Sequence, residues 1–348
     1  MREACPEHVP EIYHFCPRNG LLVTEHIPLS SSLRKSLISG ERHPTVARDV
    51  GTFCARTLFK TSGLKLSAAE LREQVKFWSA NSEMCSLTEQ VVFTEPYIHA
   101  ANNRWTSPHL DPHKAAIESD TELKVAVAKL KSKFAAQAQA LLHADLHAGS
   151  IVCCAPQGEC IREEGKTYVM DPEFAFYGPM AFDTGAFLAG VLLAYVSHAG
   201  RQQCPLSSEG QGDYAEWVLD QVATFWKAFR DEFVRLWDDP SEHMGHLGFR
   251  QEALITGEDD NAEEWSDSQN DTMIKLLRES LGFAGAKILR RIVGGAHAEE
   301  LEIIEDIHVR AMCEIQGLEI AKDLIKTADT YSSIEEAVQM AKMRKPVG

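Results

Sequence analysis

His143-Ala144-Asp145-Leu146-His147-Ala148-Gly149-Ser150 is the stretch that decides how this chain folds, together with the later Asp171-Pro172-Glu173. Two runs rich in apolar and β-branched residues, 150–154 and 166–170, lie between these acidic stretches and are separated by polar residues. Such a pair of runs predicts a hairpin, which brings its two ends together. We therefore predict that Asp145 and Asp171 share one small volume in the folded protein.

Carboxylates placed in this way suit phosphoryl transfer, which needs a base for the attacking hydroxyl and oxygen ligands for magnesium. Asp145 fits the base, and Asp171 and Glu173 fit the metal ligands. In an extended backbone residues two apart face the same side, so we expect both to reach one ion. A second interpretation takes His143, Asp145 and His147 as ligands of a transition metal, as in a zinc hydrolase. Spacing alone does not decide between the two.

Composition limits the possible partners. The 348 residues include 35 Lys and Arg against 51 Asp and Glu, a net charge of −16, which argues against nucleic acid or an anionic membrane as the main partner. The nine cysteines lack metal-ligand spacing and favour free thiols in a reducing cytoplasm. No signal-peptide pattern follows Met1, and the longest apolar run, 185–196, is too short to span a bilayer.

The rest of the chain divides into a short β segment and a long helical one. Residues 11–16 and 21–27 predict a hairpin with its turn at 17–20. Apolar spacing of three and four then predicts helices at 32–39, 44–61, 67–79, 120–140, 184–198, 214–237, 271–293, 305–326 and 333–343. Loops are expected at 95–115, 201–212 and 257–267. Asp183 is expected either to cap the helix after it or to bond back to the 143–150 loop.

Several motifs resemble a known family. Residues 142–150 resemble the catalytic loop of the aminoglycoside-phosphotransferase-like kinases, and residues 169–187 resemble the 5-methylthioribose kinases of that group. Stretches 87–93, 103–108 and 290–294 match the same family in order, so the resemblance covers nearly the whole chain. It implies an α+β, protein-kinase-like fold, with a helical catalytic lobe at 29–348 and a remnant of the N-terminal lobe and hinge at 1–28.

The resemblance also implies an activity. Enzymes of this family transfer the γ-phosphate of ATP to the 1-hydroxyl of 5-methylthioribose in methionine salvage, with Mg²⁺, and form homodimers. The residues that it assigns are Asp145 as catalytic base; Asp145, Arg290, Arg291 and Trp105 near the sugar; Glu25, His26, Ile27, Asp171, Pro172 and Glu173 at ATP; and Asp171 and Glu173 at the metal.

Two departures from the family pattern stand out. Ala144 replaces the family's usual glycine, and is strained there if the position needs a positive φ. A Gly-rich loop and its following lysine are not found before Glu25, so we expect the chain to lack most of the N-terminal lobe. The alternative function is a non-catalytic homologue that binds sugar or a full-length partner subunit. A kinase for an amino alcohol or aminoglycoside ranks lower, because the 171–187 run and the paired arginines speak against it.

Overall fold

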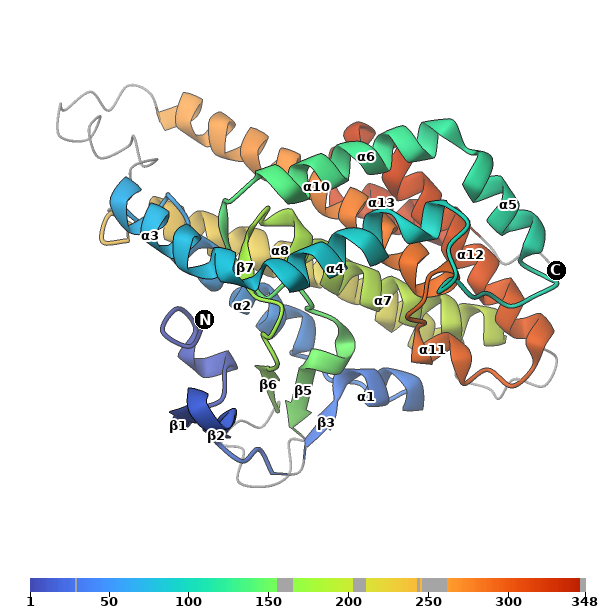
Figure 1. Cartoon of the computed structure of the whole chain (residues 1–348), viewed down its shortest axis with the longest axis horizontal. Coiled ribbons are helices and arrows are strands. Elements are labelled where there is room, and N and C mark those ends of the chain that lie inside the picture. The colour runs from blue at the N-terminus through green and yellow to red at the C-terminus, as the bar shows by residue number, and fades with distance from the viewer. Residues whose placement is uncertain (29, 155–164, 203–210, 243–244, 246–261, 345–348) are drawn as a thin grey trace.

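Short strands lie on one side of a large helical body (Figure 1). The computed structural model describes residues 1–28, 30–154, 165–202, 211–242, 245 and 262–344. Near the N-terminus, β1 (Ile12–Cys16) and β2 (Leu21–Thr24) pair antiparallel and form a separate two-stranded sheet. The turn between them includes Gly20 in the left-handed conformation, with φ 58°. The predicted N-terminal hairpin is therefore confirmed.

The hairpin next to the 143–150 loop is also present. β5 (Ile151–Cys154) pairs antiparallel with β6 (Lys166–Val169), and β3 (Ser30–Ser32) adds on the other side of β5. The turn of this hairpin, 155–164, lies outside the described residues. A further pair, β4 (Ala140–Leu142) and β7 (Phe176–Gly178), corrects the prediction that the preceding helix runs to 140.

Helices make up most of the remaining chain. They are α1 (Leu33–Ser39), α2 (Val46–Lys60), α3 (Ala68–Trp78), α4 (Ser82–Phe93), α5 (Asp111–Ser119), α6 (Thr121–Ala136), α7 (Ala181–Gln202), α8 (Gln211–Asp238), α10 (Ala262–Val293), α11 (Glu299–Glu302), α12 (Ile307–Lys326) and α13 (Ile334–Met343). Asp120 caps α6 by accepting from the Leu123 N–H, as expected. Two loop predictions are wrong in part, because α5 begins within 95–115 and α10 already includes 262–267. Residues 203–210 and 257–261 of the predicted loops lie outside the described part of the chain.

Helix α7 is the centre of the core and packs against both α8 and α10. Its stretch Ala181–Gly200 is long and apolar enough to cross a membrane, which corrects the length inferred from 185–196. However, 94% of that stretch is buried inside the protein, as in the core helix of many globular folds. The predicted apolar face of α8 is confirmed as core, since Phe225, Phe229 and Phe233 are fully or almost fully buried.

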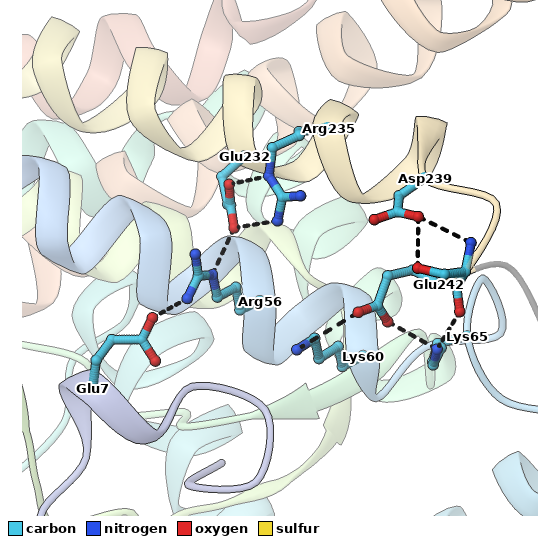
Figure 2. A network of polar contacts seen from close by, with 9 residues as sticks. Glu7, Arg56, Lys60, Lys65, Glu232, Arg235, Asp239 and Glu242 are labelled. Carbon is cyan, nitrogen blue, oxygen red and sulfur yellow. Dashed lines mark hydrogen bonds and ion pairs between the residues drawn. The ribbon is translucent and has the colours of Figure 1, made fainter.

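A polar network holds the N-terminal segment against this helical body (Figure 2). Arg56 of α2 pairs with Glu7 on one side and, through Nε at 2.6 Å, with Glu232 of α8 on the other. Glu232 also pairs with Arg235 of α8, at 2.7 Å. Because Arg56 pairs with both Glu7 and Glu232, it links the N-terminal segment to α2 and α8.

By contrast, the β1–β2 hairpin leaves large apolar side chains in contact with solvent. Ile12, Phe15, Leu22 and Val23 are exposed by 51%, 63%, 54% and 40% of their surface. The sequence predicts this, because an isolated pair of strands cannot bury both of its faces.

Candidate active site

A buried aspartate anchors the loop 143–150 to helix α7. Asp183, in the first turn of α7, accepts hydrogen bonds from the backbone N–H of His143 at 2.6 Å and of Ala144 at 2.8 Å. Its side chain is almost fully buried. Burial raises the pKa of Asp183, while His143, the two N–H donors and Lys287 oppose the rise. Of the two expected roles for Asp183, the bond back to the loop is therefore confirmed.

Ala144 has φ 68°, in the left-handed region. The Cβ of an L-residue makes this conformation costly, by about 1 kcal/mol or more, and glycine avoids the cost. The strain expected from the sequence is therefore present.

We expect Ala144→Gly to raise the free energy of unfolding by about 1 kcal/mol, because it removes this strain. Urea denaturation measures the change. Ala148→Gly is the matched control: Ala148 lies in the same loop without a positive φ, so glycine there should lower stability. Equal effects of the two substitutions would contradict the interpretation.

Both ring nitrogens of His143 make hydrogen bonds inside the loop region. Nε2 donates to the Met170 carbonyl at 2.8 Å, and Nδ1 accepts from the Asp145 N–H at 3.3 Å. The first bond ties the loop to the residue before Asp171. Asp145 and Asp171 nevertheless line two different cavities, so the prediction that they share one small volume is not confirmed. The zinc-type interpretation is not supported, because neither nitrogen of His143 is left for a metal. Within the described ranges, the ligand atoms that converge belong instead to Cys5, Glu7 and His8.

Asp145 lies among basic side chains. Lys287 Nζ of α10 is 3.8 Å from Oδ1, and His147 Nε2 is 3.4 Å from Oδ2. Burial raises the pKa of Asp145, but Lys287, His147 and the two arginines Arg291 and Arg290 outweigh burial and hold it below its ordinary value. Asp145 is therefore ionised at neutral pH and ready to accept a proton or a hydrogen bond.

His147 orients its ring toward this carboxylate. The Ser150 N–H donates to Nδ1 at 3.1 Å, so the proton of the neutral ring is on Nε2, which faces Asp145. Burial lowers the pKa of His147 to about 4, although Asp145 acts in the opposite direction. At neutral pH the His147 ring is thus uncharged.

Among the charged neighbours of Asp145, Lys287 has a pKa close to neutral pH. It is buried, donates to the Ala144 carbonyl at 3.4 Å and lies 4.3 Å from the Phe182 ring centre. Burial lowers its pKa to about 8, against the opposing effect of Asp145. The ammonium is therefore present below pH 8 and lost above it.

We expect kcat/KM to fall above about pH 8, because this quantity reports the protonation of the free enzyme. Lys287→Met should lower kcat/KM at pH 7 by about a hundredfold and remove this alkaline limb. Lys287→Arg, which stays charged, should move the limb to higher pH. A pH profile of all three proteins tests this, and an unchanged limb in the Met variant would contradict it.

Two cavities meet the loop 143–150 without sharing a lining residue. The narrow cavity has about 400 Å³ of empty space including its mouth, and Asp145, His147, Lys287, Arg291, Arg34 and Glu300 line its polar part. The wide cleft, with about 2530 Å³ of empty space including its mouth, is reached by His143, Gly149 and Ser150 of the loop. Its apolar walls come from β1, β2, β5 and β6, and from Phe77 and Trp78 of α3.

Asp171, Pro172 and Glu173 all line the wide cleft. Asp171 has φ 64°, and Glu173 begins a turn, so the expectation of an extended backbone here is wrong. A left-handed residue before a proline turns the chain instead of continuing β6. Both carboxylates are nevertheless exposed on the same cleft, and such oxygen donors are those that Mg²⁺ prefers.

The triplet Glu25-His26-Ile27 follows β2 beside this cleft. Thr24 is among the described lining residues, and the triplet is not. The Glu25 N–H already donates to the Glu11 carbonyl at 2.7 Å, and the Glu25 side chain accepts from the Glu11 N–H at 3.1 Å. In this arrangement the Glu25 backbone donor is engaged within the hairpin.

Of the residues predicted to lie near the sugar besides Asp145, Arg291 lines the narrow cavity, and Arg290 and Trp105 do not. Arg291 lines the narrow cavity, and Arg290 lies close enough to Asp145 to lower its pKa. Buried Nε of Arg290 has no hydrogen-bond partner in the described structure. Trp105 is outside both described linings: its Nε1 donates to Asp111 at 2.7 Å and Lys114 lies 5.8 Å from its ring. Trp105 is placed as a packing anchor of its loop.

The sequence reasoning missed three charged residues of the narrow cavity. Lys287 precedes Arg290 and Arg291 by three and four residues, a spacing that puts them on one helix face and would have indicated it. Arg34 of α1 and Glu300 of α11 lie far from the motifs in sequence. Arg34 Nε is 3.4 Å from Oε1 of the buried Glu300.

Comparison with known proteins identifies the family. The pattern of the phosphotransferase enzyme family matches residues 3–243. Methylthioribose kinase 1 of Oryza sativa subsp. japonica is 41% identical over 97% of this chain and 74% of its own length. The chain belongs to the methylthioribose kinase family. This membership confirms the α+β, protein-kinase-like fold and the catalytic class, a phosphotransferase that uses ATP.

Bacterial relatives match over nearly the same length. Methylthioribose kinase of Escherichia coli O45:K1 (strain S88 / ExPEC) is 37% identical over 97% of this chain and 76% of its own length. The chain therefore spans about three quarters of the length of these relatives. A solved glucosamine kinase superimposes with a TM-score of 0.45 and 14% sequence identity, over 93% of this chain and 68% of the other.

Proposed function

We propose that this chain transfers the γ-phosphoryl group of ATP to the 1-hydroxyl of 5-methylthioribose. The observation that carries the proposal is the ionised Asp145 in a cavity with Lys287 and Arg291 on one side and small apolar residues on the other. A sugar with hydroxyls at one end and a methylthio group at the other matches this division. The relatives at 37–41% identity bear the name of that kinase.

Each charged group then has a defined task. Asp145 accepts the proton of the attacking hydroxyl, because its low pKa keeps it ionised and it faces the cavity. Lys287, Arg290 and Arg291 offset the negative charge that gathers on the transferring phosphoryl oxygens. His147 Nε2 lies 3.4 Å from Asp145 Oδ2, so the ring supports the carboxylate from one side.

The wide cleft is assigned to the nucleotide. Its apolar walls suit an adenine ring, and Asp171, Pro172 and Glu173 reach its edge beside the loop. Asp171 and Glu173 would hold Mg²⁺, which when bound neutralises charge on the ATP phosphates. Within the described residues, nothing at Asp145 or around it favours a non-catalytic homologue.

The test is a phosphotransfer assay on the purified chain with ATP, Mg²⁺ and 5-methylthioribose. We expect ADP release that depends on the sugar, and a product whose phosphorus resonance and mass identify a sugar 1-phosphate. Glucosamine and choline serve as alternative acceptors. Turnover of either one in preference to methylthioribose would contradict the substrate assignment, and ADP release without any acceptor would contradict transfer to a sugar.

A further inference from the structure

Helix α7 contains a glycine for which the packing gives no reason. Gly185, Gly190 and Gly200 are its three glycines. A Cβ on Gly185 would lie 2.6 Å from the Ser280 carbonyl oxygen, and one on Gly200 would overlap Cys313 Sγ, so close helix contacts require both. A Cβ on Gly190 would meet nothing closer than Ala148 N at 3.7 Å, an ordinary contact distance.

Glycine in a helix interior is unfavourable by about 0.5–1 kcal/mol relative to alanine. At Gly190 no close contact compensates for that cost. Gly190 is part of the lining of the narrow cavity, so the missing methyl group leaves space there.

The same face of α7 supplies the apolar wall of this cavity. Ala186, Ala189 and Leu193 line it together with Gly190, at the three- and four-residue spacing of one helix face. The charged residues Asp145, Lys287 and Arg291 are part of the polar lining of the same cavity. Lys287 is buried and contacts the Ala144 carbonyl, Asp145 and the Phe182 ring. The cavity therefore offers one charged part for hydroxyls and one wall without hydrogen-bonding side chains.

We propose that this wall is the subsite for the alkylthio substituent of the sugar, and that Gly190 sets the size of substituent that fits. The inference rests on the proposed function and extends it to substrate selectivity. A sugar that carries a hydroxyl in place of the alkylthio group gains nothing from the wall. A longer alkyl chain must find its space beside Gly190.

The experiment compares Gly190→Ala with the wild type on 5-methylthioribose, 5-ethylthioribose and ribose. The substitution should raise Tm by about 2 °C, because it improves helix propensity without a close contact. It should raise KM about tenfold for methylthioribose and more for ethylthioribose, since a methyl group then occupies the space of the substituent. The inhibition constant of ribose should change less than twofold.

Ala189→Gly is the mirror variant from the same wall. It should lower Tm, because it removes a buried methyl group from the helix, and should improve KM for ethylthioribose relative to methylthioribose. Stability and selectivity thus move in opposite directions in the two variants. A merely structural role would shift Tm alone.

The outcomes separate the two proposals. Suppose that the wild type turns over methylthioribose, and that Gly190→Ala changes the two KM values and the inhibition constant of ribose by the same factor. This result would support the kinase function and overturn the subsite. Unchanged KM values together with the higher Tm would also overturn the subsite. If the wild type neither turns over methylthioribose nor binds it in calorimetry, both the proposed function and the inference that rests on it are overturned.

Discussion

Replacing Asp145 by asparagine is expected to lower kcat about a thousandfold while KM for the sugar changes little. Asparagine has nearly the same shape and can still accept hydrogen bonds, but it cannot take the proton of the attacking hydroxyl. It also removes the charge that Lys287 faces at 3.8 Å, so the pKa of the buried Lys287 should fall further below 8. A coupled ADP-release assay at saturating ATP measures kcat.

The matched control is Asp231→Asn. Asp231 is an exposed carboxylate on α8 that pairs with Lys227 at 2.6 Å, far in sequence from the loop. The same change of charge there should leave kcat within twofold, since exposed ion pairs contribute little. If Asp145→Asn keeps more than a third of the wild-type kcat at an unchanged Tm, Asp145 is not the proton acceptor.

The second large effect is expected at Asp183. Asp183→Ala leaves the N–H groups of His143 and Ala144 without their acceptor in a buried position, and each unsatisfied donor costs about 1–3 kcal/mol. We expect the free energy of unfolding to fall by about 3 kcal/mol. The kcat should fall at least tenfold at a temperature where the variant is fully folded, because the loop that carries Asp145 loses its anchor.

Asp183→Asn separates the two effects. Its amide oxygen can still accept one of the two hydrogen bonds, so the loss of stability should be roughly half that of the alanine variant. Urea denaturation gives the free energies, and kcat is measured on the same samples. A large loss of stability with an intact kcat would show that Asp183 supports the fold and does not position Asp145.

Much of the site follows from local sequence. The two strand-like runs between the acidic stretches predict β5 and β6, and hence the approach of Met170 to the loop. The replacement of glycine by Ala144 predicts the strain at φ 68°. Asp183 was recognised as a residue that either caps a helix or bonds to the loop. These features depend on residues within about forty positions of one another.

What the sequence could not predict depends on distant contacts or on a single backbone angle. Arg34 and Glu300 meet because α1 and α11 pack near the same cavity, and no periodicity relates them. The left-handed turn at Asp171 breaks the extended geometry that would align it with Glu173. Trp105 is conspicuous in sequence, but its indole N–H is already bonded to Asp111.

The arrangement of the two cavities on the loop 143–150 has a consequence for the order of events. Since the two cavities share no lining residue within the described part of the chain, a sugar in one leaves the other open to the nucleotide. We therefore expect both substrates to be bound together, with the phosphoryl group transferred directly and without a phosphorylated protein intermediate. Initial rates measured at several concentrations of each substrate should then give double-reciprocal lines that intersect, where a ping-pong scheme gives parallel ones.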